Sequence, residues 1–335
     1  MGRKKAGKTA EVKVPRILVG VLALFAILGL TARPAPAKEK NFCKKTTEAA
    51  LNACLKEAKS DYWIQRGNCY NISDPADKKE CVKEAEDDYK DAKDECKEQY
   101  KARLEVCKSL GKAAYDPAID PGNFVDPGDI GNTVDPNPYF PLVPGYKWTY
   151  QTVDVNSNEV TEIITDEVLD ETKEIMGVKC IVVHDVVKTP EGDVIEDTYD
   201  WYAQDTEGKV WYFGESSLEY EETGLVSTEG SWISGVDGAK PGIIMEANPA
   251  PGDVYRQEFS LGNAEDLAEV LSIGEETVSV PAGTYTDDIL KTRDFTPLEP
   301  GHDEYKYYAP GVGVVKEENP EGGERVELVS FTTGE

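Results

Sequence analysis

Six cysteines are arranged symmetrically within 65 residues near the start of the chain. They stand at positions 43, 54, 69, 81, 96 and 107, so the successive gaps are 11, 15, 12, 15 and 11 residues. An antiparallel hairpin requires such mirror symmetry, because equal steps away from its turn bring residues opposite each other. The spacing therefore predicts three nested disulfides, Cys43–Cys107, Cys54–Cys96 and Cys69–Cys81.

The two arms of this hairpin have the composition of helices. Residues 44–66 and 76–110 are rich in Lys, Glu, Ala and Leu, which are good helix formers. Asp74 and Pro75 predict the start of the second helix as N-cap and first helical residue, and Gly111 predicts its end. Gaps of 11 and 15 residues are about three and four helical turns, which keeps the cysteines on one face.

Two functional interpretations of the cysteines are weaker than the structural one. A zinc site requires closely spaced C-x₂₋₄-C pairs and a redox site requires C-x-x-C, and the sequence has neither. Disulfides also stabilise a helix pair that has little apolar core. We therefore expect a rigid stalk or docking arm, with a glycosylation sequon, Asn71-Ile72-Ser73, at its tip.

The first 37 residues predict export. Six basic residues precede an apolar run of about 14 residues, Ile17 to Leu30, and Ala35-Pro36-Ala37 offers a cleavage site. The run is short for a bilayer span, which needs about 20 residues, so a cleaved secretory signal is favoured over an uncleaved anchor. Either interpretation places the remainder in a periplasmic, cell-surface or extracellular compartment that permits disulfides.

Charge divides the exported part into two segments. Residues 38–115 are almost neutral, with 17 basic and 16 acidic side chains, whereas residues 116–335 carry 12 and 47. The whole chain has a formal charge of −28, so nucleic acid is a poor partner, and membrane contact is expected only through the N-terminal segment if it is uncleaved. With only two histidines, sites built from several imidazoles are excluded.

Residues 113–141 predict a linker between a helical domain at 38–112 and an acidic domain at 142–335. Asp-Pro occurs four times in it, which disfavours both helix and regular strand and predicts an extended spacer that packs partly through Phe124 and Ile130. Asp126, Asp129 and Asp135 are possible calcium ligands, but their spacing does not match a calcium-binding loop. No cofactor is therefore expected, with calcium as a weak alternative.

The acidic domain has the alternating pattern of short strands. We predict strands at 147–155, 161–168, 178–188, 194–204, 210–215, 218–223, 224–232, 254–261, 268–273, 276–280, 289–295, 304–309, 312–318 and 325–331. Consecutive strands without intervening helices pair antiparallel. The expected fold class is α+β, a disulfide-stapled antiparallel helical hairpin followed by an antiparallel β half-barrel or barrel-like domain.

One predicted hairpin carries aromatic residues on both faces. A four-residue loop, 205–208, would place Tyr202 opposite Trp211 and Trp201 opposite Tyr212. One face would pack in the core, and the other would be covered by a further layer or would form an apolar groove. These four residues are the candidate ligand-binding side chains. No catalytic or metal-binding residue is assigned.

Cys180 and His184 lie on the same face of one predicted strand. A Cys–His nucleophilic pair is conceivable, but residues four apart on a strand are about 13 Å apart, too far for direct proton transfer. A buried free thiol and a hydrogen-bonded histidine are the favoured interpretation, and pairing of Cys180 between molecules is an alternative.

Three motifs of the acidic domain resemble a bacterial family. Tyr139-Phe140-Pro141-Leu142 with Trp148-Thr149-Tyr150, then Val280-Pro281-Ala282-Gly283-Thr284-Tyr285, then Tyr307-Tyr308-Ala309-Pro310-Gly311-Val312-Gly313 look like the pattern of uncharacterised exported proteins and lipoproteins. The central stretch WYAQDTEGKVWYFGE resembles the same group. The resemblance implies a β domain similar to half-barrel periplasmic lipid carriers, although no lipobox cysteine follows the apolar run.

The sequence thus predicts an exported, non-catalytic binding protein. Its β domain would hold an apolar small molecule or an envelope protein partner, and its hairpin would act as a rigid docking arm. A structural surface protein without a pocket is the first alternative, and a carboxylate-based hydrolase is a weaker one.

Overall fold

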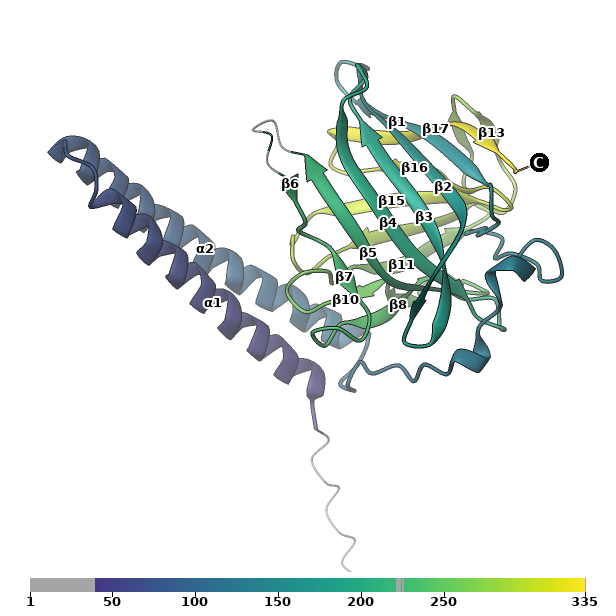
Figure 1. Cartoon of the computed structure of the whole chain (residues 1–335), viewed down its shortest axis with the longest axis horizontal. Coiled ribbons are helices and arrows are strands. Elements are labelled where there is room, and N and C mark those ends of the chain that lie inside the picture. The colour runs from purple at the N-terminus through teal and green to yellow at the C-terminus, as the bar shows by residue number, and fades with distance from the viewer. Residues whose placement is uncertain (1–39, 221–223, 225, 335) are drawn as a thin grey trace, which may run out of the picture. The chain divides into compact units, whose positions relative to one another are not determined.

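The computed structural model describes residues 40–334 apart from 221–223 and 225, and Figure 1 shows their arrangement. The segment 1–37, interpreted above as a secretory signal, lies outside the described residues. From residue 40 onward, the helices, the linker and the sheet belong to one compact unit. Within the described part of the chain, none of the helices is long and apolar enough to span a membrane.

Two helices form the predicted hairpin. Helix α1 spans Phe42–Cys69 and helix α2 spans Pro75–Ser109. Asp74 caps α2 as expected, because its side chain accepts hydrogen bonds from the backbone N–H groups of Ala76 and Asp77 at 2.8 and 3.1 Å. Gly111 follows α2 with φ +89°, a conformation that glycine adopts without strain.

All three predicted disulfides are confirmed. Cys43–Cys107, Cys54–Cys96 and Cys69–Cys81 join α1 to α2 with Cα–Cα distances of 5.7, 5.8 and 5.7 Å. The bridges lie along the seam between the helices, where Ala50, Ala58 and Ala85 are also buried. Small residues and sulfur therefore take the place of a leucine-rich core.

The rest of the chain forms a curved, nearly closed antiparallel sheet, which confirms the α+β fold class. The strand bounds are β1 Lys147–Asp154, β2 Val160–Ile175, β3 Val178–Lys188, β4 Val194–Gln204, β5 Val210–Tyr220, β6 Val226–Ser227, β7 Trp232–Ile233, β8 Lys240–Met245, β9 Val254–Arg256, β10 Glu258–Phe259, β11 Leu267–Ile273, β12 Val278–Val280, β13 Gly283–Tyr285, β14 Leu290–Phe295, β15 Asp303–Ala309, β16 Gly313–Glu318 and β17 Glu324–Thr332.

The order of the strands shows how the curved sheet closes into a ring. The sheet runs β10-β8-β5-β4-β3-β2-β1-β17-β16-β15-β14-β11-β9, and the strands at its two ends, β9 and β10, are consecutive in sequence. A single residue, Gln257, joins them. The chain itself thus connects the two edges of the sheet.

Several features of the predicted strands are wrong. The expected strand 224–232 is replaced by the two-residue strands β6 and β7, and β8, which contains Pro241 and Gly242, was not expected. The aromatic hairpin is shifted by one residue, since Gln204 pairs with Val210 and Tyr202 with Tyr212. The shift arises because the Asp205 carboxylate accepts hydrogen bonds from the N–H groups of Glu207 and Lys209, which stabilises a longer loop.

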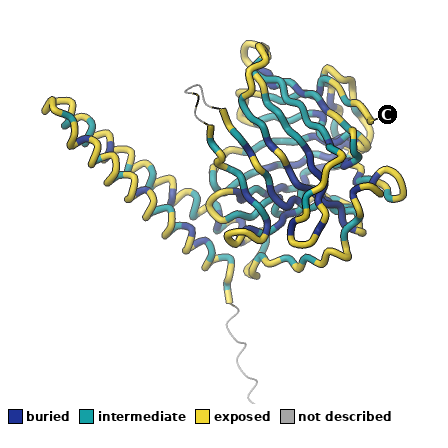
Figure 2. Tube along the Cα trace, in the orientation of Figure 1, coloured by how far each residue is buried: buried dark blue, intermediate teal, exposed yellow. Residues whose placement is uncertain are grey.

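The sheet has an apolar cluster on each face. The inner cluster includes Trp148, Tyr150, Val183, Tyr202 and Tyr212. The smaller outer cluster is built around residues such as Val178, Cys180, Val182, Trp201 and Phe213. Figure 2 shows the buried positions concentrated on the strands and the exposed ones on the helices and loops.

The linker covers the outer cluster. Phe124 packs against Phe213 and Trp211 with ring centroids 5.6 and 6.2 Å apart. Its neighbour Val125 donates a backbone hydrogen bond to Gln204, and Ile130 is buried in the inner cluster. Phe124 and Ile130 therefore pack as predicted, and the linker lies along the sheet as a strap instead of an open spacer.

Replacing Gly242 by alanine is expected to destabilise the fold by more than about 3 kcal/mol, because a Cβ would lie 2.0 Å from the Gln257 carbonyl oxygen. Gly242 lies on β8 and Gln257 lies between β9 and β10, where the two segments pass each other. The added Cβ would therefore force these two backbone segments apart. Denaturant unfolding measures the loss. Gly67→Ala is the control, since that glycine lies in α1 with open space around it, and it should be neutral or slightly stabilising. Equal stability of the two variants would contradict the close approach.

Candidate functional site

Acidic side chains occupy inner-face positions of the sheet where apolar residues are expected. Asp166 alternates in phase with Ile164 and Val168 on β2, and Asp185 follows Ile181 and Val183 on β3. The same holds on other strands. The full set, called here the inner carboxylates, is Asp166, Asp185, Asp200, Glu215, Glu258, Asp266, Asp294 and Glu317.

Some of these groups line a polar cavity of about 240 Å³, called here the acidic cavity. Its lining includes Glu258, Asp266, Asp294, Glu304 and Lys306. The Lys306 side chain is 26% exposed although strands surround it, because it faces this space. The interior of the sheet is therefore a cavity that water can enter, and acidic residues outnumber basic ones in its wall.

Lys306 is surrounded by carboxylates. Its Nζ lies 3.8 Å from Asp294 Oδ2, 3.9 Å from Glu304 Oε2 and 3.6 Å from Glu317 Oε2. Burial by itself would lower the pKa of Lys306, but the three carboxylates raise it well above its ordinary value. One cation thus faces three anions, which leaves an excess of negative charge.

A second acidic group is organised by tyrosine. The Tyr212 hydroxyl lies 2.5 Å from Asp200 Oδ1 and 2.9 Å from Glu215 Oε2, and it donates to one of them. The Tyr212 ring stacks on the Tyr202 ring with centroids 4.6 Å apart. Both rings also line the acidic cavity. The cavity therefore offers flat aromatic surface beside carboxylates.

Burial and mutual repulsion raise the pKa values of the inner carboxylates. Burial, then the charge of Glu196, raises the pKa of Asp185 to about 7, and burial raises the pKa of Glu215 to about 7. Asp166 stands directly opposite Asp185 across β2 and β3, and burial and the Asp185 charge raise its pKa well above the ordinary value. The two carboxyl groups therefore form a coupled pair in which each charge disfavours ionisation of the other.

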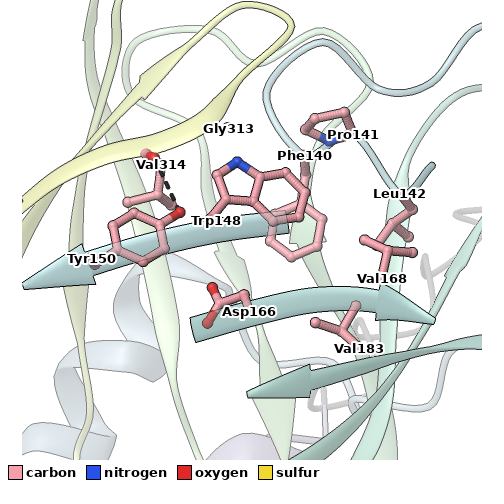
Figure 3. A pocket seen from close by; sticks show the side chains of 10 residues that line it. All are labelled: Phe140, Pro141, Leu142, Trp148, Tyr150, Asp166, Val168, Val183, Gly313 and Val314. Carbon is pink, nitrogen blue, oxygen red and sulfur yellow. Dashed lines mark hydrogen bonds between the residues drawn. The ribbon is translucent and has the colours of Figure 1, made fainter. Parts of the chain in front are cut away.

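Asp166 also borders a small apolar pocket. It has a volume of about 70 Å³, and Figure 3 shows the side chains that line it. Trp148, Tyr150 and Leu142 form much of its wall, and Asp166 is the charged residue among those labelled. The Tyr150 hydroxyl donates to the Val314 carbonyl oxygen at 3.2 Å. This pocket has room for a small apolar group but not for a lipid chain.

The four aromatic residues selected from the sequence are divided between the two faces. Tyr202 and Tyr212 face inward and meet in the stack at the acidic cavity. Trp201 and Trp211 belong to the outer cluster, where Lys173 Nζ lies 3.2 Å from the centroid of the Trp201 ring. The outer indoles are thus covered by the linker and by Lys173, and a ligand in the cavity would reach only the tyrosines.

The other candidate residues have structural partners. Cys180 is a buried free thiol, as favoured from the sequence. His184 Nε2 lies 2.8 Å from Asp197 Oδ1, and its ring stacks on Tyr199. Asp126 accepts a hydrogen bond from the Gly128 N–H and pairs with Lys179 at 2.6 Å. Across the described ranges, no group of three or more His, Cys, Asp or Glu residues is arranged to hold a metal ion.

The inner carboxylates do not stand out in the sequence. A signal was present, because acids such as Asp166 and Asp185 keep the phase of the apolar residues on their strands. That signal was lost among the 47 acidic residues of segment 116–335. Only the curvature of the sheet brings acids from strands far apart in the chain to one cavity.

Comparison with known proteins finds similarity only among solved structures. No protein-family model and no curated protein sequence matches this chain. Among solved structures, it is similar to a Bacteroides fragilis protein described as exported, with a YmcC-like fold, at 16% identity and a TM-score of 0.37. A Parabacteroides distasonis protein described as a lipoprotein gives 15% identity and a TM-score of 0.34. Each match covers 59% of this chain and 100% of the other.

Proposed function

We propose that this protein is an exported, non-catalytic binding protein whose acidic cavity takes a small organic cation with an aromatic or apolar body. The observation that carries the proposal is a cavity of about 240 Å³ in which four carboxylates outnumber one lysine and one histidine and two stacked tyrosines form part of the wall. Such a wall attracts a protonated amine through charge and holds its ring or chain through stacking.

This proposal refines the expectation of a purely apolar ligand. The described apolar pocket of about 70 Å³ is too small for a lipid chain, whereas the acidic cavity approaches the size of small-molecule sites, about 300 Å³ and above. A ligand that carries an ammonium group pairs with carboxylates that otherwise repel one another. The apolar part of the ligand then contacts Tyr202 and Tyr212.

Export and the docking role of the hairpin are part of the same proposal. The apolar N-terminal segment and the three disulfides support an oxidising compartment. The stapled helices provide a rigid arm, and α1 exposes Trp63 and Ile64 near its tip, at 55% and 61% of their surface. These side chains are where contact with an envelope partner is expected.

Calorimetric titration with phenethylammonium tests the cavity. We expect binding to the disulfide-bonded protein at pH 8, and much weaker binding of 2-phenylethanol, which has the same ring without the charge. Glu304→Gln removes a cavity carboxylate and should weaken phenethylammonium binding about tenfold or more. Glu191→Gln, on an exposed loop, is the control and should bind like the wild type.

The same titration should depend on pH. Between pH 8 and pH 5.5, Asp185 and Glu215, whose pKa values are about 7, take up protons. The negative charge of the interior then falls, and affinity for the cation should fall by about tenfold or more. Equal affinity for the amine and the alcohol, or an affinity independent of pH, would contradict a cation site.

A further inference from the structure

A buried ion pair joins the hairpin to the sheet. The Arg103 guanidinium on α2 contacts the Glu265 carboxylate through Nη2–Oε1 at 2.7 Å and through Nε at 3.0 and 3.1 Å. Both side chains are almost completely buried, at 6% and 2% exposure. Glu265 Oε1 also accepts the Gly262 N–H at 2.8 Å. Both carboxylate oxygens of Glu265 therefore already accept hydrogen bonds, from Arg103 and from the backbone.

A second guanidinium, one nitrogen of which lacks an acceptor, lies beside this pair. Arg256, on β9, interacts electrostatically with both Glu265 and Arg103. Its Cζ lies 4.8 Å from the centroid of the Phe259 ring and 5.5 Å from that of Tyr115. Its Nη1 is buried and has no hydrogen-bond partner. A buried guanidinium nitrogen without an acceptor is costly, and an anion would satisfy it.

These groups border a pocket of about 360 Å³ between the start of α1, the end of α2 and the sheet. Much of the wall is apolar, formed by residues such as Phe42, Leu110, Phe259 and Leu261. Arg103 and Arg256 supply two positive charges and Glu265 one negative charge, and Asp237 is a further acid of the lining that is itself exposed. The N-terminus of α1 adds partial positive charge.

We propose that this junction pocket binds a small organic carboxylate with an apolar chain. The carboxylate pairs with the Arg256 guanidinium, and the chain lies against the apolar wall. In a chain with a charge of −28, two arginines on the wall of one pocket are a feature that solubility does not require. A free inorganic anion would satisfy Arg256 but would leave the apolar wall without contacts, so the carboxylate fits the pocket better.

Calorimetric titration of the disulfide-bonded protein with sodium hexanoate tests the proposal, with 1-hexanol as the uncharged ligand of similar length. Hexanoate is expected to bind and hexanol is expected to bind at least about tenfold more weakly. Arg256→Met keeps an unbranched side chain without the charge and should weaken hexanoate binding about tenfold or more. Arg325→Gln, on β17, should leave it unchanged.

Further measurements check that the variant is folded, that charge is responsible for binding, and that an inorganic anion does not bind instead. Circular dichroism shows whether Arg256→Met remains folded, and Arg256→Lys should retain part of the affinity if charge is what matters. Inorganic phosphate is titrated in parallel. Equal hexanoate binding by the wild type and Arg256→Met, absence of binding by the wild type, or binding of phosphate in preference to hexanoate would each overturn the proposal.

Discussion

Reduction of the three disulfides is expected to unfold the hairpin while the sheet stays folded. The buried residues of the two helices are few, mainly alanines and the cysteines, so helix packing alone provides little stability. Each bridge contributes about 2–4 kcal/mol by restricting the unfolded chain. Together the three bridges contribute more to the stability of the hairpin than any other single feature. Without them, the helices should lose most of their structure.

Circular dichroism with and without a thiol reductant measures this effect. The far-ultraviolet helical signal should fall strongly, while the near-ultraviolet signal of the buried tryptophans of the sheet should remain. Cys54→Ala/Cys96→Ala removes only the central bridge and should lower the free energy of unfolding of the hairpin by about 3 kcal/mol. Cys180→Ala is the control, because Cys180 is unpaired. A helical signal unaffected by complete reduction would contradict the prediction.

Acidification from pH 8 to pH 5 is expected to stabilise the protein. The pKa of Asp185 in the folded chain is about 7, above the unfolded value of about 3.9, and several other inner carboxylates are shifted in the same direction. The folded state therefore holds more protons than the unfolded state between these two values. Its stability is lowest above pH 7 and increases as the pH falls toward 4.

The expected size of the pH effect is large. The shift of Asp185 alone corresponds to at most about 4 kcal/mol. The other inner carboxylates add to this effect, whereas water in the cavity reduces the contribution of each group. We therefore expect the melting temperature to rise by at least about 5 °C between pH 8 and pH 5. Thermal unfolding followed by circular dichroism in buffers of equal ionic strength measures it.

Neutral variants separate the inner carboxylates from the overall charge. Asp185→Asn/Glu215→Gln should raise stability by about 2 kcal/mol or more at pH 8 and should reduce the dependence on pH. Glu171→Gln/Glu174→Gln removes the same charge from exposed positions of β2 and should do neither. If both pairs of substitutions act alike, overall repulsion and not the interior is responsible.

The hairpin was predictable from the sequence because its constraints are local and symmetric. The cysteine positions fix the pairing, and Asp74, Pro75 and Gly111 fix the helix ends within a few residues. The antiparallel character of the sheet followed from alternation along single strands. By contrast, the register of the aromatic hairpin depended on one side chain, Asp205, whose hydrogen bonds to the loop change the pairing by one residue.

The interior could not be predicted in the same way. Asp166 and Asp294 both interact electrostatically with Glu317, although 127 other residues separate them in the chain. Their proximity depends on the order in which the strands pair, which alternation does not specify. Tyr202 and Tyr212 were selected as candidate residues for their aromatic character, and the carboxylates beside them were not.

The junction at Gln257 has a consequence for the behaviour of the protein at high concentration. Long unpaired strands act as templates onto which another molecule can add its own backbone. Here the terminal strands of the ring are only three and two residues long and adjoin each other in the chain. Little backbone is left to recruit a neighbour, so the folded β domain should resist intermolecular cross-β assembly even though it is built almost entirely of strands.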